Sequence, residues 1–264
     1  MSQTRRETSI NDIYKSMIYG SIAGTAEVAA NHPFWTMKTR SQRTLPFTMQ
    51  PTILYRGIIP NTMSTMPITA TQTAMFQTVK RIFFPDASKM SSSQMITCAF
   101  MAGVGAASIA APTELLMTVQ DKHGGFYRAA QYIMKNTGWK GIYHGFMATA
   151  LRDGIFTAGY LAGSPIAKSY IQPYVTNDFA AGLCAGFTAG LISSVTSQAI
   201  DTIKTEQQSS EGQQRIGIVT AARKIKSSSG MIGFFNGGFF RGARIMSAVT
   251  IMSMVNEKLT AKFG

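Results

Sequence analysis

Residues 33–38 read PFWTMK, residues 112–117 read PTELLM, and residues 199–204 read AIDTIK. The three stretches are variants of one motif and lie 79 and 87 positions apart. A second motif, aromatic-x-Gly, follows each of them, as YRG at 55–57, YHG at 143–145 and FNG at 235–237. Two motifs that recur in the same order indicate internal repeats. The chain is therefore expected to be one domain, 1–264, built from three repeats at about 10–90, 91–174 and 175–264.

Long stretches without charge surround these motifs. No charged residue lies between Arg56 and Lys80, Lys89 and Glu114, or Asp178 and Asp201. Each gap holds more than 20 residues, which suffices for a helix to cross a bilayer. Stretches 16–37, 145–167 and 238–256 are also apolar but contain isolated charges. The pattern predicts an all-α membrane protein with six transmembrane helices, and a soluble bundle of six buried helices is the alternative.

Small residues favour the membrane over the soluble alternative. Gly, Ala, Ser and Thr fill the six stretches more than Leu does, as is typical of helices that pack closely in a bilayer. Gly20 and Gly24 in the first stretch share one helix face, and so do Gly182, Gly186 and Gly190 in the fifth. These glycines are expected at close helix contacts.

The basic residues divide unequally between the two sides of the predicted bundle. The net charge is +13. Loops 38–56, 121–140 and 204–226 carry +4, +3 and +3, whereas 1–15, 80–89 and 168–178 carry +1, +2 and 0. This asymmetry follows the positive-inside rule and suggests contact with anionic lipid. A nucleic-acid partner is not expected, because the charge lies in loops between apolar stretches rather than on a groove-sized helix.

Signatures of an enzyme are not found. His32, His123 and His144 form no metal-ligand pair at helical spacing, and Cys98 and Cys184 lie 86 positions apart. No cofactor, metal site or catalytic residue is expected. Residues 1–12 also lack a cleavable signal.

The first repeated motif resembles the signature P-x-[DE]-x-x-[KR]-x-[KR]-x-Q of the mitochondrial carrier family. Each copy departs from it, most visibly at Trp35, Met117 and Ala199. The resemblance implies six tilted helices around a central cavity, pseudo-threefold symmetry and short helices on the matrix side. Residues 126–136 and 216–228 suit two of these short helices, and the first loop has little room for one. The implied protein is a monomer in the mitochondrial inner membrane, or in a host's if the source has no mitochondria.

The resemblance also implies a matrix gate in which the acid of each repeat meets the base of the next. Glu114 would pair with Lys204, and Asp201 with Lys38. Both members of the third pair are apolar, so Trp35 would contact Met117, a favourable thioether–aromatic contact. The conserved glutamines of the motif correspond to Gln42 and Gln208.

The opposite, cytoplasmic gate is expected to be weak. The family motif [FY]-[DE]-x-x-[KR] ends each even helix, but here Gln77, Pro165 and Asn256 replace its acids. Lys80 and Lys168 remain and would be unpaired, unless Glu257 or Lys258, one position off the motif, rescues one pair. Such a gate predicts partly unidirectional transport.

Substrate contacts are implied at one depth of the cavity. Ser64, Arg152 and Arg244 occupy equivalent positions, seven residues after the three aromatic-x-Gly glycines. Arg152 with Asp153 resembles the amino-acid and carnitine carriers, in which a guanidinium would hold a carboxylate and an aspartate an amine. Arg244 would hold a second anionic group, and Arg241 would join Arg152 and Arg244 in gripping the phosphates of a nucleotide. The expected substrate is a small carboxylate-bearing or zwitterionic metabolite. The alternatives are a nucleotide carrier and an uncoupled pore or membrane scaffold.

Cardiolipin is the expected lipid partner. The resemblance places its phosphates near the aromatic-x-Gly motifs, where helix N-termini offer free N–H groups. The residues assigned to this role are Tyr55, Arg56, Gly57, Tyr143, Gly145, Phe235 and Gly237.

Overall fold

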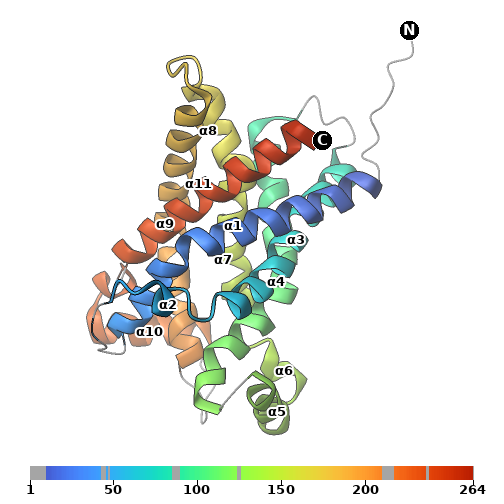
Figure 1. The fold of residues 1–264 in the computed structure, drawn as a ribbon. Coiled ribbons are helices and arrows are strands. Elements are labelled where there is room, and N and C mark those ends of the chain that lie inside the picture. Colours follow the sequence, from blue (N-terminus) through green and yellow to red (C-terminus); the bar gives the residue numbers. More distant parts are fainter. Residues whose placement is uncertain are drawn as a thin grey trace.

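The computed structural model describes residues 10–42, 46, 48–84, 90–123, 126–209, 217–235 and 238–263, and most of them are helical. No strand occurs among them. Six long helical segments dominate (Figure 1). They are α1 (Ile10–Gln42), α3 (Ile58–Phe83), α4 (Ser92–His123), α7–η2–α8 (Phe146–Ala158, Gly159–Gly163, Ser164–Ile171), α9 (Asp178–Ser209) and α11 (Gly238–Phe263). The all-α prediction is confirmed.

Short helices join the long ones at one end of the molecule. These are α2 (Pro51–Leu54), α5 (Phe126–Thr137), α6 (Trp139–Ile142), α10 (Ile218–Ser229) and η3 (Ile232–Phe235). As expected, α5 and α10 are full helices, whereas α2 is a single turn. We name this the loop-helix end. The opposite, terminus end holds α8 and the C-terminus (Figure 1), and there Lys15 Nζ donates to the Phe263 carbonyl at 3.0 Å.

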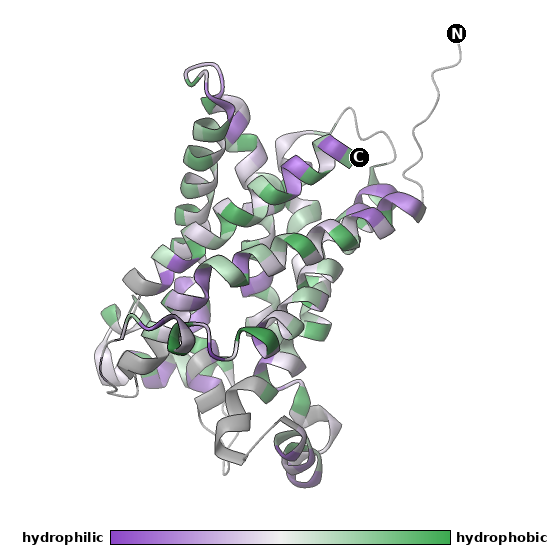
Figure 2. Cartoon of the chain, viewed as in Figure 1, coloured by the Kyte–Doolittle hydropathy of each residue, from purple (hydrophilic) through white to green (hydrophobic). Residues whose placement is uncertain are grey.

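The long helices form a closed ring. In order, α1 packs on α3, α3 on α4, α4 on α7, α7 and α8 on α9, α9 on α11, and α11 on α1. Two of the helices, over Ser92–Leu116 and Asp178–Lys204, are long and apolar enough by composition to cross a membrane. Figure 2 shows hydrophobic residues along the middle of the long helices and more hydrophilic ones toward their ends.

Two faces of α9 show how apolar residues are placed outside the ring and polar residues inside it. Phe187, Leu191 and Val195 recur every four residues and are all exposed on the outside. Ser193, Ser197 and Asp201 follow the same spacing and line the central cavity instead. A helix with apolar residues outside and polar ones inside suits a lipid surround and a polar core.

Glycines allow the closest helix contacts, as expected. A Cβ at Gly20 would lie 2.3 Å from Thr73 Oγ1 on α3. Cβ atoms at Gly186 and Gly190 would each lie 2.6 Å from a Cα atom of α11. The contact at Gly182 is less tight, because a Cβ there would lie 3.5 Å from its nearest neighbour, the Met254 side chain. Glycine is therefore required where α1 meets α3 and where α9 meets α11.

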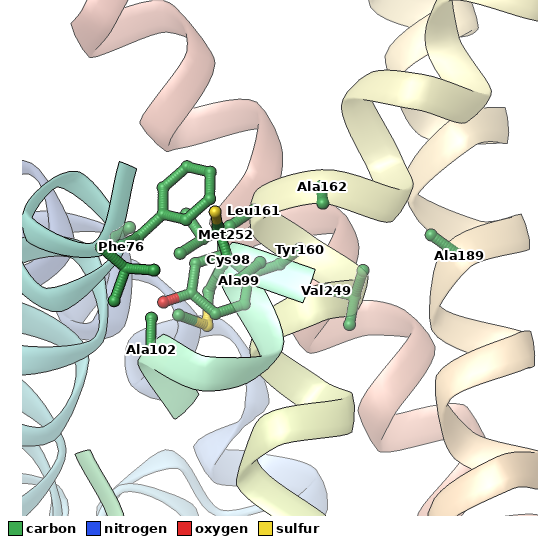
Figure 3. Close-up of a cluster of buried hydrophobic side chains, with 12 residues drawn as sticks. Phe76, Cys98, Ala99, Ala102, Tyr160, Leu161, Ala162, Ala189, Val249 and Met252 are labelled. Atoms are coloured by element: carbon green, nitrogen blue, oxygen red, sulfur yellow. The ribbon is translucent and has the colours of Figure 1, made fainter. Parts of the chain in front are cut away.

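A compact apolar cluster fills the bundle on the terminus side of the cavity (Figure 3). Its members are mostly small, and the larger ones include Phe76, Tyr160 and Met252. Tyr160 is 1% exposed, and its hydroxyl donates to Gln72 Oε1 at 3.0 Å. Nearby, Ser164 Oγ lies 2.8 Å from Ser253 Oγ. These contacts join α3, α8, η2 and α11 across the ring.

Candidate functional site

A central cavity of about 220 Å³ lies inside the ring and is lined from all six long segments. Its charged lining residues are Glu27, Glu114, Arg152, Asp153, Asp201, Arg241 and Arg244. Hydroxyl and amide groups of Thr65, Thr69, Gln72, Ser193 and Ser197 lie between them. Charges of both signs therefore surround a space of metabolite size.

Arg152 links three carboxylates. Its Nη2 lies 2.6 Å from Glu114 Oε1 and 2.5 Å from Asp153 Oδ1, and its Nη1 lies 3.7 Å from Asp201 Oδ1. The planar guanidinium fork suits several carboxylates at once. Arg152 is thus the centre of an ion cluster between α4, α7 and α9.

Two further cations complete the cluster. Lys204 pairs with Glu114, as the family motif implies. Arg241 Nε lies 2.9 Å from Asp201 Oδ2, and its other nitrogens donate to Gln198 Oε1 and Ser197 Oγ, both at 3.0 Å. Asp201 was expected to meet Lys38, whose side chain lies outside the described residues. The contacts of Asp201 with Arg241 and Arg152 were not foreseen from the sequence.

Trp35 and its surroundings form a separate aromatic group at the loop-helix end. The Trp35 ring stacks on His32, with centroids 5.4 Å apart, and His32 also stacks on Tyr55. The buried imidazole is held by the Arg56 carbonyl and by the Asn61 side chain. The side chains of Met117, Gln42 and Gln208 lie outside the described residues, so the Trp35–Met117 contact stays a prediction.

Four of the five expected substrate contacts line the cavity, namely Arg152, Asp153, Arg241 and Arg244. Ser64 is not among the lining residues, and its hydroxyl donates to the Asn61 carbonyl at 2.8 Å. Thr65 and Ile68 line the cavity in this part of α3.

Lys168 at the terminus end is paired rather than unpaired, through the rescue by Glu257 that the sequence left open. Its Nζ lies 2.5 Å from Glu257 Oε1 and 2.8 Å from Asp178 Oδ1. Glu257 comes one residue after the lost acid position, and Asp178 begins the neighbouring helix α9. Lys168 lies just beyond the apolar stretch 145–167. Its partial burial disfavours the charged form, but the two carboxylates outweigh this effect and raise the pKa of Lys168 above its ordinary value.

The other expected residues of this gate are less engaged. Lys80 Nζ lies 5.1 Å from the centroid of the Phe76 ring, a cation–π contact. Gln77 on α3 and Asn256 on α11 are half-buried. Lys258 lies over the Phe179 ring at 5.7 Å.

The aromatic-x-Gly motifs sit at helix starts. Gly57 and Gly145 precede α3 and α7 with φ of 86° and 81°, a left-handed conformation that favours glycine. Arg56, Tyr55, Tyr143 and Phe235 are exposed beside these turns, and Gly237 lies outside the described residues. The first N–H groups of these two helices already donate to the Tyr55 and Tyr143 carbonyls, and the expected lipid role stays a prediction.

Sequence reasoning missed several cavity residues. Ser193 and Ser197 were missed although they precede Asp201, which the gate motif had named, at a spacing of four on α9. Thr65, Thr69 and Gln72 were also missed, and they follow a similar helical spacing on α3. Polar residues at i and i+4 within an apolar stretch share one helix face. This spacing was the signal that could have identified them.

Comparison with known proteins supports a carrier. A family model described as "Mitochondrial carrier protein" matches residues 88–174 and 175–264. The mitochondrial citrate transporter B of Aspergillus niger is 28% identical, covering 93% of this chain and 92% of that protein. The mitochondrial carnitine carrier of Saccharomyces cerevisiae is 27% identical, covering 88% and 82%. The mitochondrial glycine transporter of Xenopus laevis is 27% identical, covering 99% and 94%. The chain belongs to the mitochondrial carrier protein family.

Proposed function

We propose that this chain carries a small zwitterionic or carboxylate-bearing metabolite across the mitochondrial inner membrane by alternating access. The observation that carries the proposal is the central cavity, whose lining combines three arginines with four carboxylates. A lining with charges of both signs suits a solute that has a carboxylate and a cationic group.

The charge of the lining argues against polyanionic substrates. Arg152, Arg241 and Arg244 supply +3, and Glu27, Glu114, Asp153 and Asp201 supply −4. A tricarboxylate or a nucleotide would enter a cavity with no surplus of positive charge. Two relatives, a glycine transporter and a carnitine carrier by name, move zwitterions. Because another relative is a citrate transporter by name, a tricarboxylate is included among the substrates to be tested.

The proposed arrangement in the membrane is six spans in three repeats. The basic loops at the loop-helix end would face the matrix, and the terminus end the cytoplasm. Exposed apolar residues along α9 and glycine contacts between neighbouring helices support this arrangement. The protein would act as a monomer with cardiolipin at the aromatic-x-Gly turns.

A nucleotide carrier is the second candidate, because three arginines line one cavity and could grip phosphates. The two candidates differ in one experiment. Purified protein in liposomes is assayed for uptake of labelled glycine, carnitine, citrate and ATP. Saturable uptake of glycine or carnitine, with little for ATP, is the expected result. Preferred ATP uptake would support the nucleotide reading, non-saturable flux a pore, and absence of flux a scaffold.

A further inference from the structure

Within the described part of the chain, Glu27 is a buried carboxylate without a counter-charge. It lies on α1, is 6% exposed and lines the central cavity. Its Oε1 accepts one hydrogen bond, from Asn31 Nδ2 at 3.0 Å. Among the residues whose side chains the structure describes, no Lys, Arg or His forms an ion pair with it. Burying an ionised carboxylate without a partner is costly, so Glu27 is stabilised either by taking up a proton or by meeting a cationic ligand.

The other three carboxylates of the cavity differ from Glu27 in this respect. Glu114 pairs with Lys204 and Arg152, and Asp201 pairs with Arg241. Asp153 Oδ1 is held by Arg152, although its Oδ2 is buried without a partner. Their charges are largely neutralised within the protein.

Arg244 is the corresponding cation. It lines the same cavity from α11, the helix that packs against α1. Arg152 and Arg241 are engaged by carboxylates. In the described part of the chain no carboxylate pairs with Arg244, so its guanidinium fork is available to a ligand.

We propose that Glu27 and Arg244 are the two poles of the ligand site, Glu27 receiving the ligand's cationic nitrogen and Arg244 its carboxylate. The inference rests on the proposed function and narrows it to a zwitterion. The two side chains carry opposite charges on neighbouring helices without pairing with each other. A zwitterion spanning them satisfies both charges and fixes its own orientation. A polyanion would meet repulsion from Glu27.

Glu27→Gln is the direct test, and Glu206→Gln is the matched control. Glu206 also lies on a long helix but pairs with exposed Lys224, and it does not line the cavity. In liposomes, Glu27→Gln should raise KM for glycine or carnitine at least tenfold, with a smaller change in kcat. Glu206→Gln should stay within twofold of wild type. Glu27→Asp should recover part of the affinity. A wild-type KM in Glu27→Gln would overturn the proposal.

A second readout does not depend on transport. Glycine or carnitine should raise the melting temperature of the wild-type protein, but not that of Glu27→Gln or Arg244→Gln. The unliganded Glu27→Gln protein should melt at or above the wild-type temperature, because the change removes an unpaired charge. A lower melting temperature would show instead that Glu27 has a structural role and would overturn the proposal.

A proton is the competing occupant of Glu27. If the carboxylate only carried a proton, uptake would depend on a pH gradient, Glu27→Gln would abolish that dependence, and KM would not change. That result would overturn the proposal while leaving the proposed function intact. Conversely, a wild-type protein that transports none of the four compounds, yet is stabilised by glycine through Glu27, would contradict the function but support the site.

Discussion

Arg152 combines two features that the sequence assigned to separate parts of the protein, the substrate contacts in the cavity and the ion pairs of the matrix gate. It lines the cavity at the expected substrate depth, and it also ties Glu114 to Asp153 and Asp201. Its guanidinium is already engaged by these carboxylates, so Arg152 holds the cavity wall together while the ligand's carboxylate is proposed to bind Arg244.

Arg152 and Arg244 should respond differently to removal. Arg152→Ala leaves buried Asp153 without its cation and half-buried Glu114 and Asp201 with one cation fewer, so it should destabilise the protein by about 3–5 kcal/mol as well as abolish uptake. Arg244→Ala should abolish uptake with little change in melting temperature. Thermal unfolding and liposome uptake measure the two effects, and Arg223→Ala, on the exposed surface of α10, is the control. Equal melting temperatures for Arg152→Ala and Arg244→Ala would contradict the role of Arg152 in the cluster.

The sequence identified most residues of the site, but it predicted few of the pairs that these residues form. The family motif implied the Glu114–Lys204 pair, and the pair is present in the structure. The contact of Arg152 with Glu114 joins positions 38 apart, and that of Lys168 with Glu257 joins positions 89 apart. Such contacts depend on how two helices are rotated against each other, and no single helix encodes that rotation.

At the scale of elements, glycine contacts decide how closely α9 and α11 pack. A Cβ at Gly190 would lie 2.6 Å from the Met246 backbone, whereas one at Gly182 would have 3.5 Å of space. Backbone cannot move aside as a flexible side chain can. The two positions therefore make a matched pair on one helix.

Gly190→Ala should destabilise the protein by about 1–3 kcal/mol, because overpacking forces the two helices apart. Gly182→Ala should be neutral or slightly stabilising, since Ala is the better helix former. Thermal unfolding of both variants in detergent makes the comparison. Equal effects at the two sites would mean that α9 and α11 are not in close contact.

The segment α7–η2–α8 shows what the repeat pattern did not reveal. The fourth apolar stretch was expected to be one helix, but Gly159–Gly163 forms a π-helical turn. A Cβ at Gly159 would lie 2.2 Å from Ser193 Oγ, so this turn brings the segment close to α9. The repeat period and the hydropathy of the sequence predict that a helix exists, but they do not reveal a single wider, π-helical turn within it.

At the scale of the whole molecule, contacts close the bundle at both ends of the cavity. The ion cluster lies toward the loop-helix end. The apolar cluster, the Tyr160–Gln72 and Ser164–Ser253 bonds and the Lys168–Glu257 pair lie toward the terminus end. The terminus end is thus better closed than the lost acids suggested, and this weakens the case for partly unidirectional transport.

Exchange should therefore be faster than uptake into empty liposomes. Internal substrate lets the carrier return loaded, whereas the empty carrier must form both sets of contacts without a ligand. Uptake of labelled glycine or carnitine with and without internal substrate measures the ratio. Equal rates would restore the weak-gate hypothesis.

Alternating access is the central claim, and a reversible cross-link between α8 and α11 tests it most directly. Ser164 and Ser253 are buried with their Oγ atoms 2.8 Å apart, so Ser164→Cys with Ser253→Cys should form a disulfide on oxidation. The background carries Cys98→Ala and Cys184→Ala. Oxidation should abolish uptake by locking the terminus end shut, and reduction should restore it. Unchanged uptake in fully cross-linked protein would contradict the account.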